Sequence, residues 1–79
     1  MKLSYDTLVE YLRQGREIEF YFSGKKYSFS NNNDGCYITE YNNPIDQAFK
    51  TPDELIEKGT IDGHSIKEIW DSVVIDIIF

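Results

Sequence analysis

Apolar positions near the start of the chain recur with the spacing of one helix face. Tyr5, Leu8, Val9 and Leu12 follow the i, i+3, i+4, i+7 rule of an amphipathic helix. Ser4 precedes them, and serine is a favoured N-cap because its hydroxyl accepts a hydrogen bond from a free backbone N–H. The pattern predicts a helix that begins directly after Ser4.

Between residues 17 and 30 the apolar positions change to a period of two, which is the spacing of a half-buried strand. The alternation occurs in two runs with Gly24 in a turn between them, and this predicts a β-hairpin. The residues expected to face the core are Ile18, Phe20, Phe22, Tyr27 and Phe29.

A third strand is expected over residues 36–41. The preceding segment, Asn-Asn-Asn-Asp-Gly at 31–35, is made of residues that tolerate the backbone angles of tight turns. Alternation alone leaves two orientations open for this strand. The face turned away from the helices carries either Tyr37, Thr39 and Tyr41 or Cys36, Ile38 and Glu40.

The second half of the chain predicts two short helices. Residues 45–50 are ambiguous between an edge strand and an extended connection. Thr51 is suited to be an N-cap and Pro52 to be the first helical residue, and Gly59 is expected to end this helix. Ser65 and Glu68 have the spacing of a capping box at the start of the next helix, whose apolar face consists of Ile66, Ile69 and Trp70.

The chain ends in an alternating apolar segment, residues 73–79, and this predicts a closing strand. Asp76 is expected to point to solvent, which fixes the direction of its neighbours. The inward residues are then Val73, Ile75, Ile77 and Phe79, and the outward residues are Val74, Asp76 and Ile78.

The predicted element order is α-β-β-β-α-α-β within a single domain, residues 1–79. The simplest packing is an α+β sandwich of two layers, in which helices cover one face of an antiparallel sheet of about four strands.

Charge and cysteine usage bear on the partners and the compartment. The chain has 14 acidic and 8 basic residues and a net charge of −6, so phosphate backbones would repel it, and direct nucleic-acid binding is not expected. Cys36 is the only cysteine, no segment resembles a signal peptide, and no apolar run approaches the roughly 20 residues of a membrane span. These features predict a cytoplasmic protein without a membrane anchor.

The residues that could take part in catalysis or metal binding have simpler structural explanations. Asp62, His64 and Ser65 are the residue types of a catalytic triad, but adjacency in sequence does not align them, and Ser65 is explained by capping. One histidine and one cysteine cannot supply the three or four ligands of a zinc site. A domain this small also has little room for a cofactor pocket. We therefore expect no catalytic residues, no metal and no cofactor.

The sheet face turned away from the helices is expected to be rich in tyrosine and aliphatic residues. Apolar patches with a charged rim often mark protein contacts, although cross-strand tyrosine pairs also stabilise a sheet without any partner. We expect a protein-interaction module that binds another protein or forms a homodimer. The residues expected to line this contact are Tyr21, Tyr37, Tyr41, Val74 and Ile78.

An alternative follows from the net charge. An acidic protein can act as a decoy that occupies the basic groove of a nucleic-acid-binding protein. The contact would then use Glu10, Glu17, Glu19, Asp46, Asp53, Glu54, Glu57 and Asp62.

Three segments, 12–20, 49–55 and 61–70, resemble small uncharacterised proteins of Gram-positive bacteria and of their phages and mobile elements. The similar positions are caps, turns and core residues across nearly the whole chain. The resemblance implies a bacterial or phage origin and assigns no functional residue.

Overall fold

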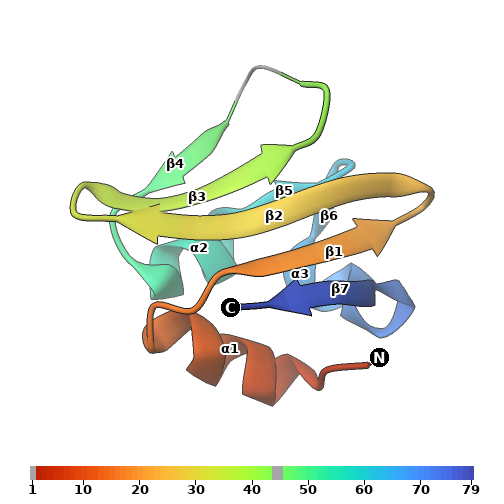
Figure 1. The fold of residues 1–79 in the computed structure, drawn as a ribbon, viewed down its shortest axis with the longest axis horizontal. Helices are drawn as coiled ribbons and strands as arrows, with labels where there is room; N and C mark the ends of the chain where they lie inside the picture. The colour runs from red at the N-terminus through yellow and green to blue at the C-terminus, as the bar shows by residue number, and fades with distance from the viewer. Residues whose placement is uncertain (1, 44–45) are drawn as a thin grey trace.

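An antiparallel sheet forms one layer of the protein in the computed structural model, which describes residues 2–43 and 46–79. Its five strands lie in the order β4-β3-β2-β1-β7 (Figure 1). Their bounds are β1 Ile18–Phe22, β2 Lys25–Asn32, β3 Gly35–Glu40, β4 Gln47–Phe49 and β7 Val74–Ile78.

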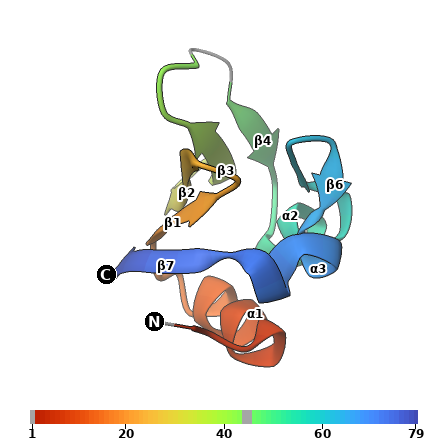
Figure 2. The same ribbon diagram turned by 90° about the vertical axis from the view of Figure 1, so that its right-hand side faces the viewer.

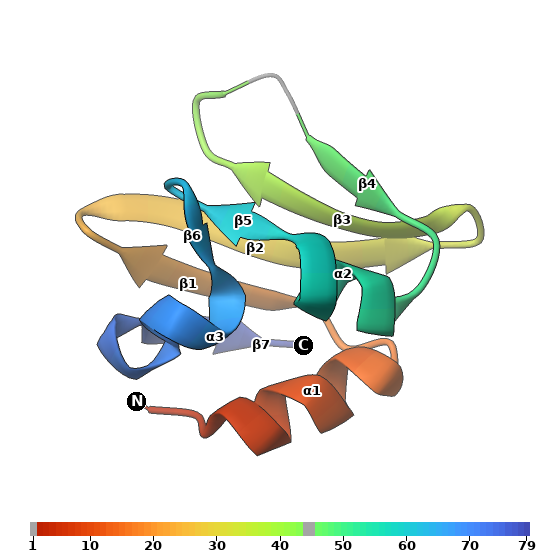
Figure 3. The same cartoon turned by 180° about the vertical axis from the view of Figure 1, so that it is seen from behind.

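Helices cover one face of this sheet. Figures 2 and 3 show α2, α3 and a small β5–β6 hairpin against that face, with α1 at the side of β7. The bounds are α1 Tyr5–Arg13, α2 Pro52–Lys58, β5 Thr60–Ile61, β6 His64–Ser65 and α3 Ile66–Ile69, with a 3₁₀ turn at Trp70–Ser72. The expected α+β class and antiparallel sheet are confirmed.

The predicted element order was incomplete. The ambiguous segment before α2 contains β4, which pairs with β3 and brings the main sheet to five strands instead of about four. The β5–β6 hairpin was not predicted, because two-residue strands have no detectable hydrophobic period.

The three predicted N-caps are present. The side-chain oxygens of Ser4, Thr51 and Ser65 each accept a hydrogen bond from the amide three residues later, at 3.1, 3.1 and 3.2 Å. The capping box at Ser65 is only half formed, since the Glu68 carboxylate lies 3.3 Å from His64 Nδ1. Gly15 has the left-handed backbone conformation expected beyond the end of α1, with φ of +81°.

Aromatic rings occupy the centre of the core between the two layers. The ring centres of Phe20 on β1 and Phe29 on β2 are 4.7 Å apart. The ring centre of Trp70 lies 5.5 Å from that of Phe20 and 6.0 Å from that of Phe29. The indole nitrogen of Trp70 donates a hydrogen bond of 2.7 Å to the carbonyl of Leu3. Trp70 therefore joins the C-terminal third of the chain to both the sheet and the N-terminal segment.

The structure decides the orientation of the third strand. Phe29 pairs with Ile38 and Asn31 with Cys36, and both β3 residues are buried in the core. The alternate positions Tyr37 and Thr39 therefore lie on the face away from the helices.

The predicted orientation of β7 holds for its first half and is wrong for its second half. Glu19 pairs with Ile77 and Phe20 pairs with Ile75, so Asp76 is an extra residue that forms a β-bulge against β1. A bulge adds one residue to one strand only, and the alternation beyond it is therefore reversed.

The reversal exchanges the environments of the last three residues. Ile78 pairs with Ile18 and packs against the core, where the alternation had placed Ile77. Ile77 is 42% exposed and Phe79 is 62% exposed, although both were predicted to face inward. Val73 and Ile75, which precede the bulge, are buried as expected.

Trp70→Ala is expected to lower the free energy of unfolding by about 3–5 kcal/mol, because it leaves a cavity against Phe20 and Phe29 and leaves the Leu3 carbonyl without its donor. Trp70→Phe retains an aromatic ring and should cost less. Urea denaturation of both variants measures the difference. A midpoint for Trp70→Ala equal to that of the wild type would contradict this account of the core.

Candidate functional site

Most of the exposed large apolar side chains of the described residues lie on the sheet face away from the helices. Among the described residues, the large hydrophobic side chains that are exposed are Tyr21, Tyr41, Val74, Ile77 and Phe79. Tyr21 pairs with Val74 across β1 and β7, and the bulge places Ile77 on the same face. Tyr41 lies on this face as well, because its ring and that of Tyr21 both adjoin the Lys26 ammonium group. We call Tyr21, Tyr41, Val74 and Ile77 the open-face patch.

Lys26 of β2 ties the strands together beside this patch. Its ammonium nitrogen lies 3.1 Å from Glu19 Oε1 on β1 and 3.2 Å from Asp76 Oδ2 on β7. The same nitrogen lies 4.8 Å from the ring centre of Tyr41 and 5.7 Å from that of Tyr21. Distances below about 6 Å allow a cation–π attraction, so Lys26 holds both rings in place.

The charge of Lys26 is retained at neutral pH. Its hydrogen bond to Glu19 is the main reason that the pKa of Lys26 lies above its usual value, and the bond to Asp76 raises it further. The bulge has a direct part in this arrangement, because Asp76 is the extra residue and points to the open face. Two carboxylates around one ammonium group leave a formal charge of −1 beside the patch.

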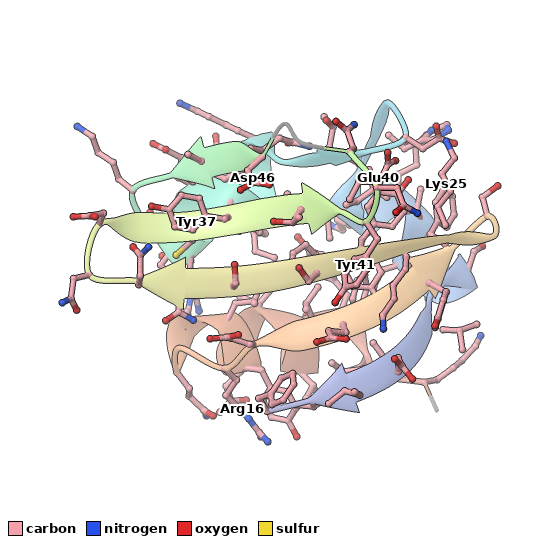
Figure 4. The ribbon with its side chains drawn as sticks, turned by 45° about the horizontal axis from the view of Figure 1, so that its top comes forward. Arg16, Lys25, Tyr37, Glu40, Tyr41 and Asp46 are labelled. Atoms are coloured by element: carbon pink, nitrogen blue, oxygen red, sulfur yellow. The ribbon has the colours of Figure 1, made fainter. Side chains whose placement is uncertain are left out.

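A hollow of about 350 Å³ adjoins the patch between β1 and the end of β3. Its walls include Tyr21, Lys26, Glu40 and Tyr41. Figure 4 shows Tyr41 over the sheet, with Glu40 and Lys25 near the same end of it. The volume is sufficient for one large side chain of a partner protein.

The five residues expected to form a contact are not all in one place. Tyr21, Tyr41 and Val74 belong to the open-face patch. Tyr37 lies on the same face but farther along β3 (Figure 4), where its hydroxyl donates to Asn32 Oδ1 at 3.3 Å. The outward direction predicted for Ile78 is wrong, since its side chain is partly buried and packs against the core.

Sequence reasoning missed Ile77 and Phe79 as exposed residues. Both follow the bulge, and no residue type in this segment marks the extra position, because bulges form at Asp and at many other residues. The pairing with β1, distant in the sequence, was needed to find them.

The residues of the suspected triad have structural partners. The Ser65 hydroxyl accepts from the Glu68 amide, His64 Nδ1 lies 3.3 Å from Glu68 Oε1, and Asp62 Oδ1 lies 3.8 Å from Lys25 Nζ. The His64 imidazole is therefore directed to Glu68 and not to the adjacent serine.

Other chemical groups give no assembled centre within residues 2–43 and 46–79. No three His, Cys, Asp or Glu side chains come close enough there to hold a metal ion. Cys36 is buried, and burial raises the pKa of its thiol, which disfavours the reactive thiolate. None of the described helices has both the length and the apolar character needed to cross a membrane.

The acidic residues of the alternative decoy site are spread over several elements, from α1 to the β5–β6 turn. Three of them have cationic neighbours: Glu19 with Lys26, Asp53 with Arg13 at 2.8 Å, and Asp62 with Lys25. Pairing lowers the field that these carboxylates present to a basic partner.

Comparison of the chain with protein-family models, curated proteins and solved structures found no match.

The same substitution at two adjacent positions, Ile77→Lys and Ile78→Lys, tests which of the two side chains is exposed after the bulge. Ile77→Lys is expected to change the free energy of unfolding by less than about 1 kcal/mol, because the position is on the surface. Ile78→Lys is expected to cost about 2 kcal/mol or more, because it places a charge against the core. Thermal denaturation of both variants gives the comparison, and equal or reversed effects would contradict the register after Asp76.

Proposed function

We propose that this protein is a protein-binding module that uses the open-face patch. The observation that carries the proposal is that four of the five exposed large hydrophobic side chains of the described chain lie on the sheet face away from the helices. Scattered apolar residues on a surface need no explanation, but a cluster beside a charged group is typical of a contact site.

The composition of the patch favours binding over a purely structural role. Tyrosine offers a large contact area and has few rotatable bonds, so its immobilisation costs little entropy. Tyr21 and Tyr41 are also held by Lys26 before any partner arrives. Such preorganisation lowers the entropy lost on binding. The adjoining hollow provides a place for an anchoring side chain.

Charge defines the expected partner. The cluster of Glu19, Lys26 and Asp76 on the open face carries a formal charge of −1, and the whole chain carries −6. Two copies of the chain therefore repel one another as they approach, while a basic protein is attracted. We propose a partner that presents an apolar centre with a basic rim, and not a second copy of this chain.

Affinity capture from a lysate of the host cell tests this proposal at about 50 mM and about 500 mM salt. The variant is Tyr21→Lys combined with Ile77→Lys, and the control is Gln14→Lys combined with Ser72→Lys, which makes the same charge change at exposed positions outside the patch. The expected result is one partner that wild type and control retain at both salt concentrations and that the patch variant loses.

Three results would contradict the proposal. The acidic decoy would be favoured if the wild type lost the partner at high salt and the patch variant still retained it at low salt. Contacts between exposed charges are screened by salt, so a decoy complex would dissociate at high salt. Capture of only its own copies would favour a homodimer. Equal capture by the patch variant and the control would exclude the open-face patch as the contact.

A further inference from the structure

A second hollow, of about 220 Å³, lies on the helix side of the sheet and separate from the open-face patch. Tyr27 and Ile38 contribute to it from the inner face of β2 and β3, and the turn between β5 and β6 forms its opposite wall. Its polar lining includes Tyr27, Glu40, Gln47, Thr60 and Asp62.

The hydroxyl group of Tyr27 lacks a partner in this hollow. Tyr27 is only 3% exposed, and its hydroxyl oxygen is buried without a hydrogen bond to any described group. The Glu40 carboxylate lies near this hydroxyl without forming a well-aligned hydrogen bond to it, and burial followed by the interaction with Glu40 raises the pKa of Tyr27 to about 12, so the hydroxyl stays protonated at neutral pH. A buried polar group without a partner costs about 1–3 kcal/mol, so a polar group that entered the hollow and bonded to this hydroxyl would gain that free energy.

The other polar groups around the hollow are chiefly acceptors. Glu40, which pairs with Tyr27 across β2 and β3, contributes a carboxylate, and Asp62 contributes another from the β5–β6 turn. The Gln47 amide is held rigidly, because its Nε2 donates to the Thr60 carbonyl at 2.7 Å and its Oε1 accepts from the Thr60 amide at 3.0 Å. Glu40 also accepts from Asn43 Nδ2 at 3.3 Å, and each carboxylate has further lone pairs for a ligand that carries several donors and a positive charge.

We propose that this hollow binds a guanidinium group, either of free arginine or of an arginine side chain in another protein. A guanidinium group is planar, always charged at neutral pH, and has five N–H donors that point in different directions. It can therefore donate to Glu40, Asp62 and the Tyr27 oxygen at the same time, while the Tyr27 proton turns to the Glu40 carboxylate.

The size of the hollow agrees with this ligand. About 220 Å³ is below the roughly 300–1,000 Å³ of sites for drug-sized molecules and cofactors, but it holds the end of an arginine side chain. A single water molecule needs only about 30 Å³ and would leave most of the hollow unfilled. An ammonium group is a compact charge with three donors and reaches fewer of the separated acceptors.

Lys25 lies close enough to the hollow for its charge to weaken the binding of a cation there. Its ammonium nitrogen lies 3.8 Å from Asp62 Oδ1, too far for a hydrogen bond but close enough to oppose a second cation. Removal of this charge is therefore expected to strengthen guanidinium binding, whereas a merely structural role of the hollow predicts no effect.

Titration of the ¹⁵N-labelled protein with N-acetyl-L-arginine amide, followed by NMR, tests the proposal. Free L-arginine and N-acetyl-L-lysine amide are titrated in parallel. The expected result is a saturable shift of the Gln47 side-chain amide and of the Thr60 and Gly63 backbone amides, at least about threefold tighter for the arginine amide than for the lysine amide. Tighter binding of free arginine than of its amide would assign the amino acid as the source, and equal or tighter binding of the amide would assign a protein side chain.

Substitutions in the wall of the hollow test whether the NMR shifts come from binding at this place. Tyr27→Phe is expected to weaken binding by about two- to tenfold, the effect of one hydrogen bond, without lowering the melting temperature, because it removes an unpaired buried hydroxyl. Asp62→Asn should weaken binding further while keeping a residue that tolerates the positive φ of this turn, 53°. Lys25→Gln should tighten binding. Glu10→Gln on α1 makes the same charge change as Asp62→Asn, serves as its matched control and should leave binding unchanged.

The proposal is overturned if the arginine probes cause no saturable shift in these amides. It is also overturned if the shifts are spread over the acidic surface, or if Asp62→Asn and Glu10→Gln bind equally well. None of these results affects the proposed protein contact, because none of the open-face patch residues lines this hollow.

Discussion

The packing of Trp70 against Phe20 and Phe29 is the interaction on which the rest of the structure depends. A domain of 79 residues buries a smaller fraction of its surface than a larger one, so its stability depends on a few large side chains. Trp70 contacts both central strands, and its indole nitrogen fixes the segment before α1 through Leu3. The 3₁₀ turn that contains Trp70 then leads directly into β7 and determines where this edge strand meets β1.

The bulge at Asp76 connects this packing to the candidate contact surface. Without the extra residue, Ile77 would continue the inward face that Ile75 begins. With it, Ile78 packs against the core, Ile77 joins the open-face patch, and Asp76 reaches Lys26 from the far side of β1. One irregularity in an edge strand therefore places an apolar residue on the open face and also supplies half of the ion-pair network beside it. Bulges at sheet edges commonly redirect side chains in this way.

The two faces of the sheet offer different recognition chemistry. On the open face the apolar groups are exposed and the main cation is already paired, so binding there depends on contact area and shape. On the helix side, the hollow beside Tyr27 has carboxylate acceptors and a buried hydroxyl, so binding there depends on hydrogen bonds and charge. Glu40 adjoins both hollows at the end of β3.

The sequence by itself determined the local features of this protein: the caps at Ser4, Thr51 and Ser65, the β1–β2 hairpin and its inward face, and the α+β class. These depend on neighbours within a few residues, which the sequence displays directly. Only the tertiary structure decided that Cys36 and Ile38 face the core, that Ile77 and Ile78 exchange sides, and that Asp62 approaches Tyr27 and Glu40. Each of these depends on which distant strand or turn a segment meets. Periodicity gives the alternation along a strand, but it carries no information about an extra residue or about the partner across the sheet.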